Sequence, residues 1–284
     1  MKKRLKGIIA EVLSLSSSSY VCNSYKVIGD IVFIRLHEMP KKHDKVLAEA
    51  IMSIHRNART VLVPAGPVYG DFRVRGLKHI AGERKTVTTH VESGCSFSVY
   101  LDACYFSPRL SYERTRIAKQ VKDGETVLNM FAGVGCLSLI IAKHSNASRT
   151  YSIDVNPLAF QFMQENIRAN GSYGRIFPVL GDAKEIIEKR LCHVAHRVLM
   201  PLPQKALEYL SLALLALKSG EGWIHYYDIE HAGRSGNAVE KTMLKVAEKL
   251  ATMNIDNKVS FGRVVRSVGP RWFQVVLDIA VRLV

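Results

Sequence analysis

The sequence predicts an α/β protein in which a doubly wound sheet follows a smaller N-terminal α+β part. Three observations lead to this fold class. From residue 124 onward, short apolar runs alternate with amphipathic stretches, as parallel strands alternate with crossover helices. A glycine-containing loop follows the first of these runs, and the last two runs have no helix between them. We therefore expect five βα units that are closed by a C-terminal β-hairpin.

The first third of the chain is predicted to form the α+β part. Its strand candidates are rich in Val, Ile and Thr, and a Gly-Asp pair at residues 29–30 marks a turn. We predict that residues 1–106 form the N-terminal domain and that residues 107–284 form the C-terminal domain. A short helix within residues 105–124 is expected to lead into the C-terminal domain. The predicted N-terminal elements are a strand pair at 25–36, a helix at 43–55 and strands at 85–93 and 96–102.

The C-terminal domain is predicted from its alternating pattern. Residues 258–281 read as two strands around a turn at Gly269 and Pro270. This ending matches the Rossmann-like sheet of class I methyltransferases better than that of a dehydrogenase, whose second half would repeat βαβ units. The predicted strands are 124–131, 148–154, 175–182, 196–202 and 222–229, and the predicted helices are 136–145, 157–170, 183–191, 204–218 and 239–253.

The charge of the chain favours a polyanionic partner. Forty lysines and arginines stand against 25 acidic residues, which gives a formal net charge of +15. Residues 1–90 hold 16 of these basic residues and 7 of the acidic ones, so the N-terminal third is the more basic part. A basic surface suits nucleic acid, although a merely solvated basic face would have the same composition.

The composition also bears on location and on metals. No apolar run reaches the roughly 18 residues that a membrane span needs, and the N-terminus lacks a secretory cleavage pattern. The five cysteines are scattered and include no C-x-x-C pair, so neither a disulfide framework nor a metal site is indicated. We expect a cytoplasmic protein without a membrane partner, and a monomer.

A cofactor site is predicted at the carboxyl ends of the first three parallel strands. Phe131 to Gly135 follow a strand and open a helix, where Gly133 and Gly135 allow the backbone to approach a cofactor closely. Asp154 closes the next strand and can accept hydrogen bonds from two ribose hydroxyls. Asp182 closes the third strand and can meet an adenine amino group. Ligands bind along this edge in doubly wound sheets.

Other interpretations exist for each of these residues. The two glycines could serve a tight turn only, and Asp154 and Asp182 could be helix N-caps. A nicotinamide cofactor is a further alternative. Against it, Ser138 occupies the place of the third glycine in the dinucleotide-binding pattern, and the hairpin closes the sheet. The two glycines, Asp154 and Asp182 all fall at the carboxyl ends of consecutive predicted strands, and this agreement favours a cofactor site.

The motifs in this region resemble a known family. The segments DACYFSPRLSYERTRIAKQV, VLNMFAGVG, SIDVNP, GDA, LMPLP and WIHYYDI resemble the archaeal and eukaryotic tRNA (guanine-37-N1)-methyltransferases. They also resemble a sibling that transfers an aminocarboxypropyl group in wybutosine synthesis. The similarity runs from about Tyr25 to the C-terminus. It implies S-adenosyl-L-methionine as cofactor and tRNA, held through the anticodon arm, as partner.

The resemblance also implies roles for individual residues. Glu113 would be the general base that removes the N1 proton of guanine, Arg73 would pair with guanine O6, and Tyr105 could position the base or the cofactor. These residue types suit the chemistry, because N1 is protonated at neutral pH and negative charge moves to O6 as the proton leaves. Glu113 could instead be a carboxylate that only favours a helix N-terminus. The expected cofactor contacts are Ser107, Arg114, Phe131, Gly133, Gly135, Asp154, Val155, Asn156, Asp182, Ala183 and Pro201.

The sequence departs from the family pattern at two positions, and other activities are possible within the family. Asn129 stands where the family commonly has Asp, and Pro201 stands where it commonly has Asn. The residues after the fourth strand, Leu202 to Glu208, follow the methyltransferase pattern, whereas the sibling carries a glycine-led motif there. The aminocarboxypropyl transferase, a bifunctional enzyme that also methylates a wybutosine intermediate, and an inactive tRNA-binding protein are the alternatives to guanine-37 methylation.

Overall fold

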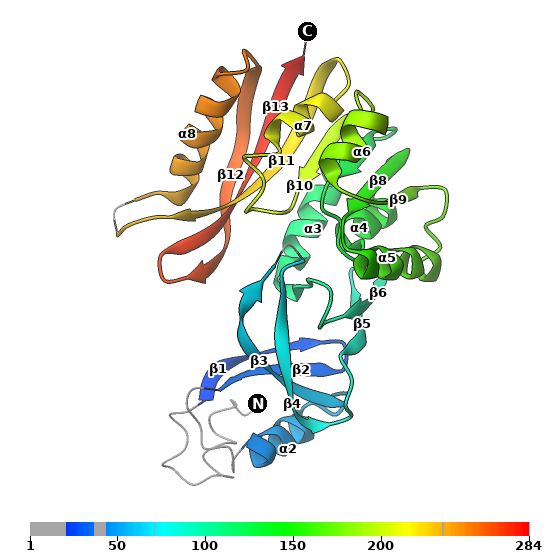
Figure 1. Ribbon diagram of the computed structural model, residues 1–284, viewed down its shortest axis with the longest axis vertical. Coiled ribbons are helices and arrows are strands. Elements are labelled where there is room, and N and C mark those ends of the chain that lie inside the picture. The colour runs from blue at the N-terminus through cyan, green and yellow to red at the C-terminus, as the bar shows by residue number, and fades with distance from the viewer. Residues whose placement is uncertain (1–20, 37–43, 71, 235, 284) are drawn as a thin grey trace. The chain divides into compact units, whose positions relative to one another are not determined.

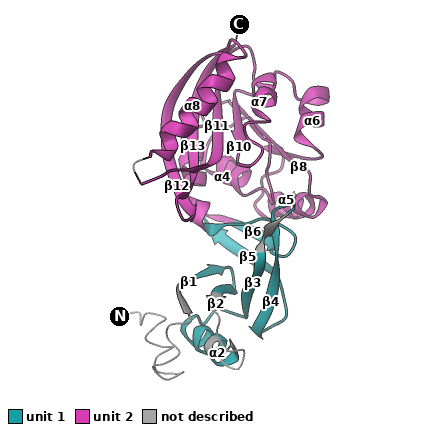
Figure 2. Cartoon of the chain, turned by 60° about the vertical axis from the view of Figure 1, so that its left-hand side comes forward, with its two compact units in different colours: residues 1–92, 96–108 teal, residues 93–95, 109–284 magenta. Residues whose placement is uncertain are grey.

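The computed structural model describes all residues except 1–20, 37–43, 71, 235 and 284 (Figure 1). The chain forms two compact units, which Figure 2 colours teal and magenta. The first unit comprises residues 1–92 and 96–108, and the second comprises residues 93–95 and 109–284. Among the described residues, no helix combines the length and the hydropathy that crossing a membrane requires.

The N-terminal part contains a four-stranded sheet with the strand order β1-β2-β3-β4. The predicted strand pair is confirmed, and its turn contains Gly29 with φ +55°, where a Cβ would lie 2.1 Å from the hydroxyl of Thr88. Helix α2 links the parallel strands β2 and β3 and shares a small core with the sheet. The elements are β1 (Val21–Ile28), β2 (Ile31–Leu36), α2 (Asp44–Ile54), β3 (Thr60–Tyr69), β4 (Val74–Gly82), β5 (Val87–Glu92) and β6 (Cys95–Tyr100).

Strands β3 and β4 were not among the predicted elements. Strand β3 contains Pro64, Gly66 and Pro67, which are residues that ordinarily mark turns. The pairing of β3 with β4 nevertheless continues through Pro64, with register shifts between Val61 and Leu62 and between Ala65 and Tyr69. The strand was not predicted because its prolines and glycine are typical of a loop. On its other side, β3 pairs with β2 in parallel over only three residues.

The second unit contains a seven-stranded sheet with the order β12-β13-β11-β10-β7-β8-β9. The five strands β7 to β11 are parallel to one another. Strand β13 pairs antiparallel with both β11 and β12. The predicted doubly wound sheet with a C-terminal hairpin is therefore confirmed. The strands are β7 (Thr126–Asn129), β8 (Arg149–Asp154), β9 (Ile176–Leu180), β10 (Arg197–Met200), β11 (Gly220–His231), β12 (Asp256–Gly269) and β13 (Trp272–Leu283).

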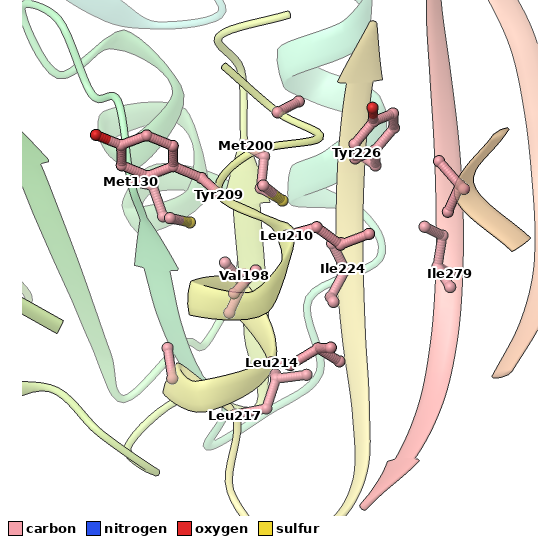
Figure 3. Close-up of a cluster of buried hydrophobic side chains, with 14 of the residues drawn as sticks. Met130, Val198, Met200, Tyr209, Leu210, Leu214, Leu217, Ile224, Tyr226 and Ile279 are labelled. Carbon is pink, nitrogen blue, oxygen red and sulfur yellow. The ribbon is translucent and has the colours of Figure 1, made fainter. Parts of the chain in front are cut away.

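Helices surround this sheet, and α6, α7 and α8 share one apolar core with it. Figure 3 shows the part of this core that lies between α7 and the strands β10 and β11. Leu210 and Leu214 of α7 belong to the same cluster as Val198 of β10 and Ile224 of β11. Burying each such side chain contributes about 1.5–3 kcal/mol, which holds the strand ends in place. The helices are α3 (Ser111–Ala118), α4 (Cys136–His144), α5 (Pro157–Ala169), α6 (Ala183–Arg190), α7 (Leu210–Ala216) and α8 (Ala238–Ala251).

Helix α7 is shorter than the predicted helix at 204–218. Residues 203–209 form turns, and the N–H of Lys205 donates to the carbonyl of Leu202. Pro201 lies just before these turns and Pro203 is the first of them, and neither can donate a backbone hydrogen bond. The α-helix begins at Leu210.

Candidate active site

The loop after β7 has a left-handed backbone conformation at both of its glycines, which glycine adopts readily. Gly133 and Gly135 have φ values of +57° and +86°, and Gly135 is the N-cap of α4. A Cβ at Gly135 would lie 2.9 Å from Cγ of Met163, so a side chain would be excluded there by space as well as by conformation. The loop therefore brings backbone N–H groups to the carboxyl edge of the sheet.

Asp154 fixes this loop from the end of β8. Its Oδ2 accepts a hydrogen bond from the N–H of Gly133 at 2.6 Å, and its Oδ1 accepts one from the N–H of Asn156 at 3.0 Å. Burial raises the pKa of Asp154 above its ordinary value, although the two backbone N–H groups oppose this shift. Such a partly desolvated carboxylate has acceptor capacity left for the hydroxyls of a ribose.

Two other residues that were predicted to contact the cofactor cap helices at the same edge. The side chain of Asn156 caps α5 by accepting from the N–H groups of Leu158 and Ala159, at 3.0 and 3.4 Å. Asp182 caps α6 through the N–H of Lys184, at 2.7 Å, as the helix-capping interpretation expected. Capping does not preclude cofactor binding by Asp182, because each of its carboxylate oxygens has two lone pairs.

Aromatic side chains border Asp182. Its Oδ2 accepts a hydrogen bond from the hydroxyl of Tyr209 at 3.1 Å, and the ring of Tyr209 meets that of Phe131 edge to face, with centroids 5.4 Å apart. Ala183 is buried beside Asp182, and Pro201 is half-buried just after the end of β10. The residues predicted from four strand ends therefore occupy one edge of the sheet.

Asn129, which departs from the family pattern, is fully buried in β7. Its amide donates to the hydroxyl of Ser138 at 3.1 Å, and that hydroxyl also accepts from Ser152 at 2.7 Å. A neutral amide suits this position, because an unpaired carboxylate at the same depth would be strongly destabilising.

The edge fits a nucleoside cofactor. Its polar groups are the Asp154 and Asp182 carboxylates and the backbone of the glycine loop. Its apolar groups include Val155, just after the end of β8, and Leu180, the last residue of β9, which are 48% and 45% exposed. Large apolar side chains left open beside strand-end carboxylates suit the faces of an adenine ring.

Asp154→Ala is expected to weaken S-adenosylmethionine binding by about 1–3 kcal/mol, because ribose hydroxyls would lose their acceptor and Gly133 would lose its anchor. Isothermal titration calorimetry measures the effect. The matched control is Asp123→Ala, which removes an exposed carboxylate from the same unit and should leave the affinity unchanged. Unaltered cofactor affinity in a folded Asp154→Ala protein would contradict the site.

Glu113 lies in the first turn of α3 and is only 3% exposed. Its Oε1 accepts hydrogen bonds from Nε and Nη2 of Arg116, at 2.9 and 2.6 Å, and from the hydroxyl of Tyr227 at 2.9 Å. Its Oε2 accepts from Nε and Nη2 of Arg263, at 3.2 and 2.7 Å. Glu113 therefore lies at a helix N-terminus, as the alternative interpretation expected, and two guanidinium groups also hold its carboxylate.

A buried polar network supports Arg116 from its other side. Asp278 of β13 accepts from Arg116, from Gln120 at 2.9 Å and from Nδ1 of His225 at 2.6 Å. Burial alone would raise the pKa of Asp278, but the hydrogen bonds from His225 and Arg116 hold it well below its ordinary value. Arg197 lies 2.7 Å from Nε2 of His225 and also pairs with a second carboxylate.

The contacts of His225 fix its protonation state. A guanidinium only donates hydrogen bonds, so Nε2 accepts from Arg197 and the single ring proton is on Nδ1, facing Asp278. Burial is the largest cause that lowers the pKa of His225, and the charges of Arg197 and Arg116 lower it further. The folded protein therefore holds a neutral imidazole in this network.

The free energy of unfolding is expected to fall as the pH decreases below about 6.5, the ordinary pKa of histidine. The unfolded chain binds a proton at residue 225 there, whereas the folded chain does not, so acid favours unfolding by up to about 1.4 kcal/mol per pH unit. Thermal unfolding at pH 7.5 and 5.5 measures the effect. His225→Gln, which keeps a donor and an acceptor but does not titrate, should reduce the difference; an equal difference in both proteins would contradict the assignment.

Three of the remaining predicted residues, Arg73, Tyr105 and Ser107, lie in the first unit. The guanidinium of Arg73 lies over the ring of Tyr105, 4.9 Å from its centroid, so the structure brings these two together. Arg73 itself occupies the turn between β3 and β4 with φ +54°, which is rare for a residue other than glycine and indicates a constrained position. Ser107 is buried in this unit, and Arg114 is buried in the second unit, on α3.

None of the three partners of Glu113, which are Arg116, Tyr227 and Arg263, was predicted from the sequence. The Glu113–Arg116 pair has the i, i+3 spacing of neighbours on a helix, which is a usable signal. Tyr227 and Arg263 are 114 and 150 residues away from Glu113, on strands whose register no local pattern specifies.

A doubly wound sheet with a C-terminal hairpin, a glycine loop after its first strand and strand-end carboxylates is the fold and cofactor edge of a class I methyltransferase. The comparisons are more specific. Residues 88–257 match the family described as the TRM5/TYW2 methyltransferase domain, and residues 5–86 match the TYW2 N-terminal domain. The chain belongs to the TRM5/TYW2 methyltransferase family.

Two curated relatives illustrate the range of this family. The chain is 35% identical, over 92% of its length and 76% of the relative, to the tRNA (guanine(37)-N(1))-methyltransferase Trm5b of Pyrococcus abyssi. It is 34% identical, over 89% of its length and 92% of the relative, to the tRNA 4-demethylwyosine(37)-methyltransferase Taw21 of Saccharolobus solfataricus.

Solved structures show the same likeness. The complex of aTrm5 with tRNALeu aligns with a TM-score of 0.83 and 33% identity over 99% of this chain and 79% of that one. Trm5 of Methanocaldococcus jannaschii in complex with adenosine aligns with a TM-score of 0.76 and 31% identity, over 98% and 78% of the two chains.

Proposed function

We propose that this chain methylates N1 of guanosine 37 in tRNA with S-adenosylmethionine as methyl donor. The observation that carries the proposal is the match, over 92% of the chain, to a curated methyltransferase named for this reaction. The strand-end carboxylates and the glycine loop supply the cofactor site that the reaction needs. A relative solved in complex with adenosine supports a cofactor that contains a nucleoside.

The proposed chemistry assigns distinct tasks to residues of the chain. S-adenosylmethionine, when bound, supplies an electrophilic methyl group on a sulfonium. Glu113 accepts the N1 proton of guanine, because N1 is protonated at neutral pH and must lose its proton. Arg73 stabilises the negative charge that develops on O6, and its stacking on Tyr105 holds the guanidinium in one orientation.

The cofactor contacts of this proposal are those predicted from the sequence. Asp154 and Asp182 bind the ribose and the adenine, and the glycine loop passes along the cofactor. The proposed set also includes Ser107, Arg114, Phe131, Val155, Asn156, Ala183 and Pro201.

Domain roles and partner follow as parts of the same proposal. Residues 1–106 form the basic RNA-contacting domain, and residues 107–284 form the cofactor domain. The excess of lysine and arginine in residues 1–90 supports the first assignment, because contacts to phosphates dominate RNA affinity. The tRNA complex of a relative supports tRNA as the partner. Recognition of the anticodon arm, a monomeric state and a cytoplasmic location belong to the proposal.

Mass spectrometry of nucleosides tests the activity. Unmodified tRNA is incubated with the protein and isotope-labelled S-adenosylmethionine, and 1-methylguanosine is expected. An aminocarboxypropyl product, which has a different mass, would assign the chain to the sibling activity. Absence of any product together with absence of cofactor binding in calorimetry would favour a tRNA-binding protein without activity.

Methyl transfer to 4-demethylwyosine is a second candidate function. The relative named for that reaction matches across 92% of its own length, whereas the guanine-37 enzyme matches across 76% of its own. The same labelling experiment on tRNA that carries 4-demethylwyosine distinguishes the two, because the labelled nucleoside is then a tricyclic product.

A further inference from the structure

The two oxygens of Glu113 are held by different kinds of partner. Oε1 accepts from Arg116 and Tyr227, both of which are deep in the unit. Within the part of the chain that the structure describes, Oε2 accepts hydrogen bonds from Arg263 alone. The departure of Arg263 would therefore free one carboxylate oxygen completely while the other stayed fixed.

The partners of Oε1 cannot leave easily. The side chain of Arg116 is 11% exposed and is bound at its far side by Asp278, which is itself 2% exposed. Tyr227 is 3% exposed, and burial raises the pKa of its hydroxyl well above the ordinary value, so it remains a donor. Breaking either contact would leave a buried group without its partner, which is costly.

Arg263 differs from these partners because it lies at the surface. It belongs to β12, the edge strand of the seven-stranded sheet, and its side chain is 30% exposed. Its guanidinium lies 4.7 Å from the ring centroid of Tyr112, which is 67% exposed. Arg263 therefore links a buried carboxylate to solvent, and an incoming anion can reach it.

The contact with Arg263 conflicts with the role proposed for Glu113. Oε2 already accepts two hydrogen bonds from the Arg263 guanidinium, and a proton taken from N1 of guanine would have to share this oxygen with a group that only donates. The base must therefore lose a partner before it acts. Because Oε1 is locked, Oε2 is the oxygen that can become available, and Arg263 is the group that must move.

We propose that Arg263 is a positioning residue that keeps Glu113 occupied until a backbone phosphate of the RNA substrate takes over its guanidinium and releases Oε2. The inference rests on the proposed function. Phosphate suits the exchange, because a guanidinium binds it through the same forked pair of N–H groups that now bind the carboxylate. RNA brings this anion together with the target guanosine, so the base becomes free only when its substrate is present.

The exchange leaves the chemistry balanced. The N1–H bond breaks as the proton moves to Oε2 of Glu113, and the N1 electron pair forms the bond to the methyl carbon. The carbon–sulfur bond breaks with its electron pair on sulfur, which gives a neutral thioether. Water afterwards takes the proton from Glu113, and Arg263 returns when the RNA departs.

Arg263→Gln tests the proposal because it should change the affinity for tRNA but not the rate of methyl transfer. We expect the tRNA dissociation constant to rise about tenfold and the salt dependence of binding to fall by about one phosphate contact. The single-turnover rate at saturating tRNA should stay within about threefold of the original, because Oε2 no longer needs to be released. Arg263→Lys, which keeps the charge, should recover part of the affinity.

Chemically altered substrates sharpen the test. tRNAs with single uncharged methylphosphonate linkages near the target guanosine remove one phosphate charge at a time. At the linkage that draws Arg263 away, the original protein should lose about tenfold in single-turnover rate, whereas Arg263→Gln should be insensitive. The matched control is Arg266→Gln on the same strand, which removes an arginine that pairs with Gln274 and should keep the original sensitivity.

The opposite pattern would overturn the proposal. If Arg263 stays on Glu113 in the complex, Arg263→Gln would keep the original tRNA affinity and salt dependence but lose rate at saturating tRNA, and the acid limb of its pH–rate profile would move. Failure of the proposed function is distinguishable, because it appears as absence of 1-methylguanosine with the unsubstituted protein, whereas the binding and salt measurements need no turnover.

Discussion

Glu113→Gln is expected to lower the single-turnover rate of methyl transfer about 100-fold or more, the usual contribution of a general base. Glutamine keeps the length of the side chain, and its carbonyl oxygen can still accept from Arg116 and Tyr227. Its amide nitrogen cannot accept the N1 proton. The affinities for cofactor and tRNA should change little, because the lost interaction is made during the chemical step.

The control must separate lost chemistry from a damaged protein, because Glu113→Gln also removes one charge from a buried ionic cluster. Glu125→Gln is the matched variant. Glu125 is likewise buried and pairs with an arginine, Arg197, at 2.7 Å, but it lies just before β7, away from the strand ends that carry the cofactor edge. It should lower the midpoint of thermal unfolding without slowing methyl transfer.

A near-normal rate for Glu113→Gln would reverse the interpretation. Glu113 would then be a structural member of the Arg116 and Arg263 cluster, and the proton would leave N1 through water or another group. The single-turnover experiment, performed at saturating tRNA and cofactor, therefore decides between the base and the structural residue.

The doubly wound sheet could be predicted because its central strands β7 and β10 are short runs that are buried on both faces. All four residues of β7 and all four of β10 are buried, and polar turn residues bound each run. The hairpin was predictable for a different reason, since only a turn separates its two apolar runs. Strand β3 was not, because its proline and glycine residues imitate a loop and only its pairing with β4 defines it.

The positions of the cofactor residues could be predicted from local sequence patterns, whereas most contacts of the Glu113 cluster could not. Asp154 and Asp182 were predictable because each follows a strand, and parallel strands end at one edge. What the sequence could not show is which atoms these carboxylates already bind, such as the N–H of Gly133. Arg263 was not predicted at all, because its contact with Glu113 depends on the register of β12 at the edge of the sheet.

Asp278→Ala is expected to destabilise the second unit by about 3–5 kcal/mol, the cost of leaving buried charged partners unpaired. Asp278 accepts hydrogen bonds from Arg116, Gln120 and His225, and its side chain is 2% exposed. Alanine would leave Nδ1–H of His225 without an acceptor, and Arg116 would keep only Glu113 as a charged partner. Asp278→Asn, which retains one acceptor oxygen, should cost less.

Urea unfolding followed by circular dichroism measures this loss. The matched control is Glu221→Ala, which removes the carboxylate of an ion pair with Arg282 whose side chains are 78% and 66% exposed, and which should leave the unfolding midpoint unchanged. A loss below about 1 kcal/mol for Asp278→Ala would mean that water replaces the carboxylate, as it does at exposed pairs. The expected larger loss follows because the partners on α3 and β11 converge on Asp278 in the interior, where no other described carboxylate contacts His225.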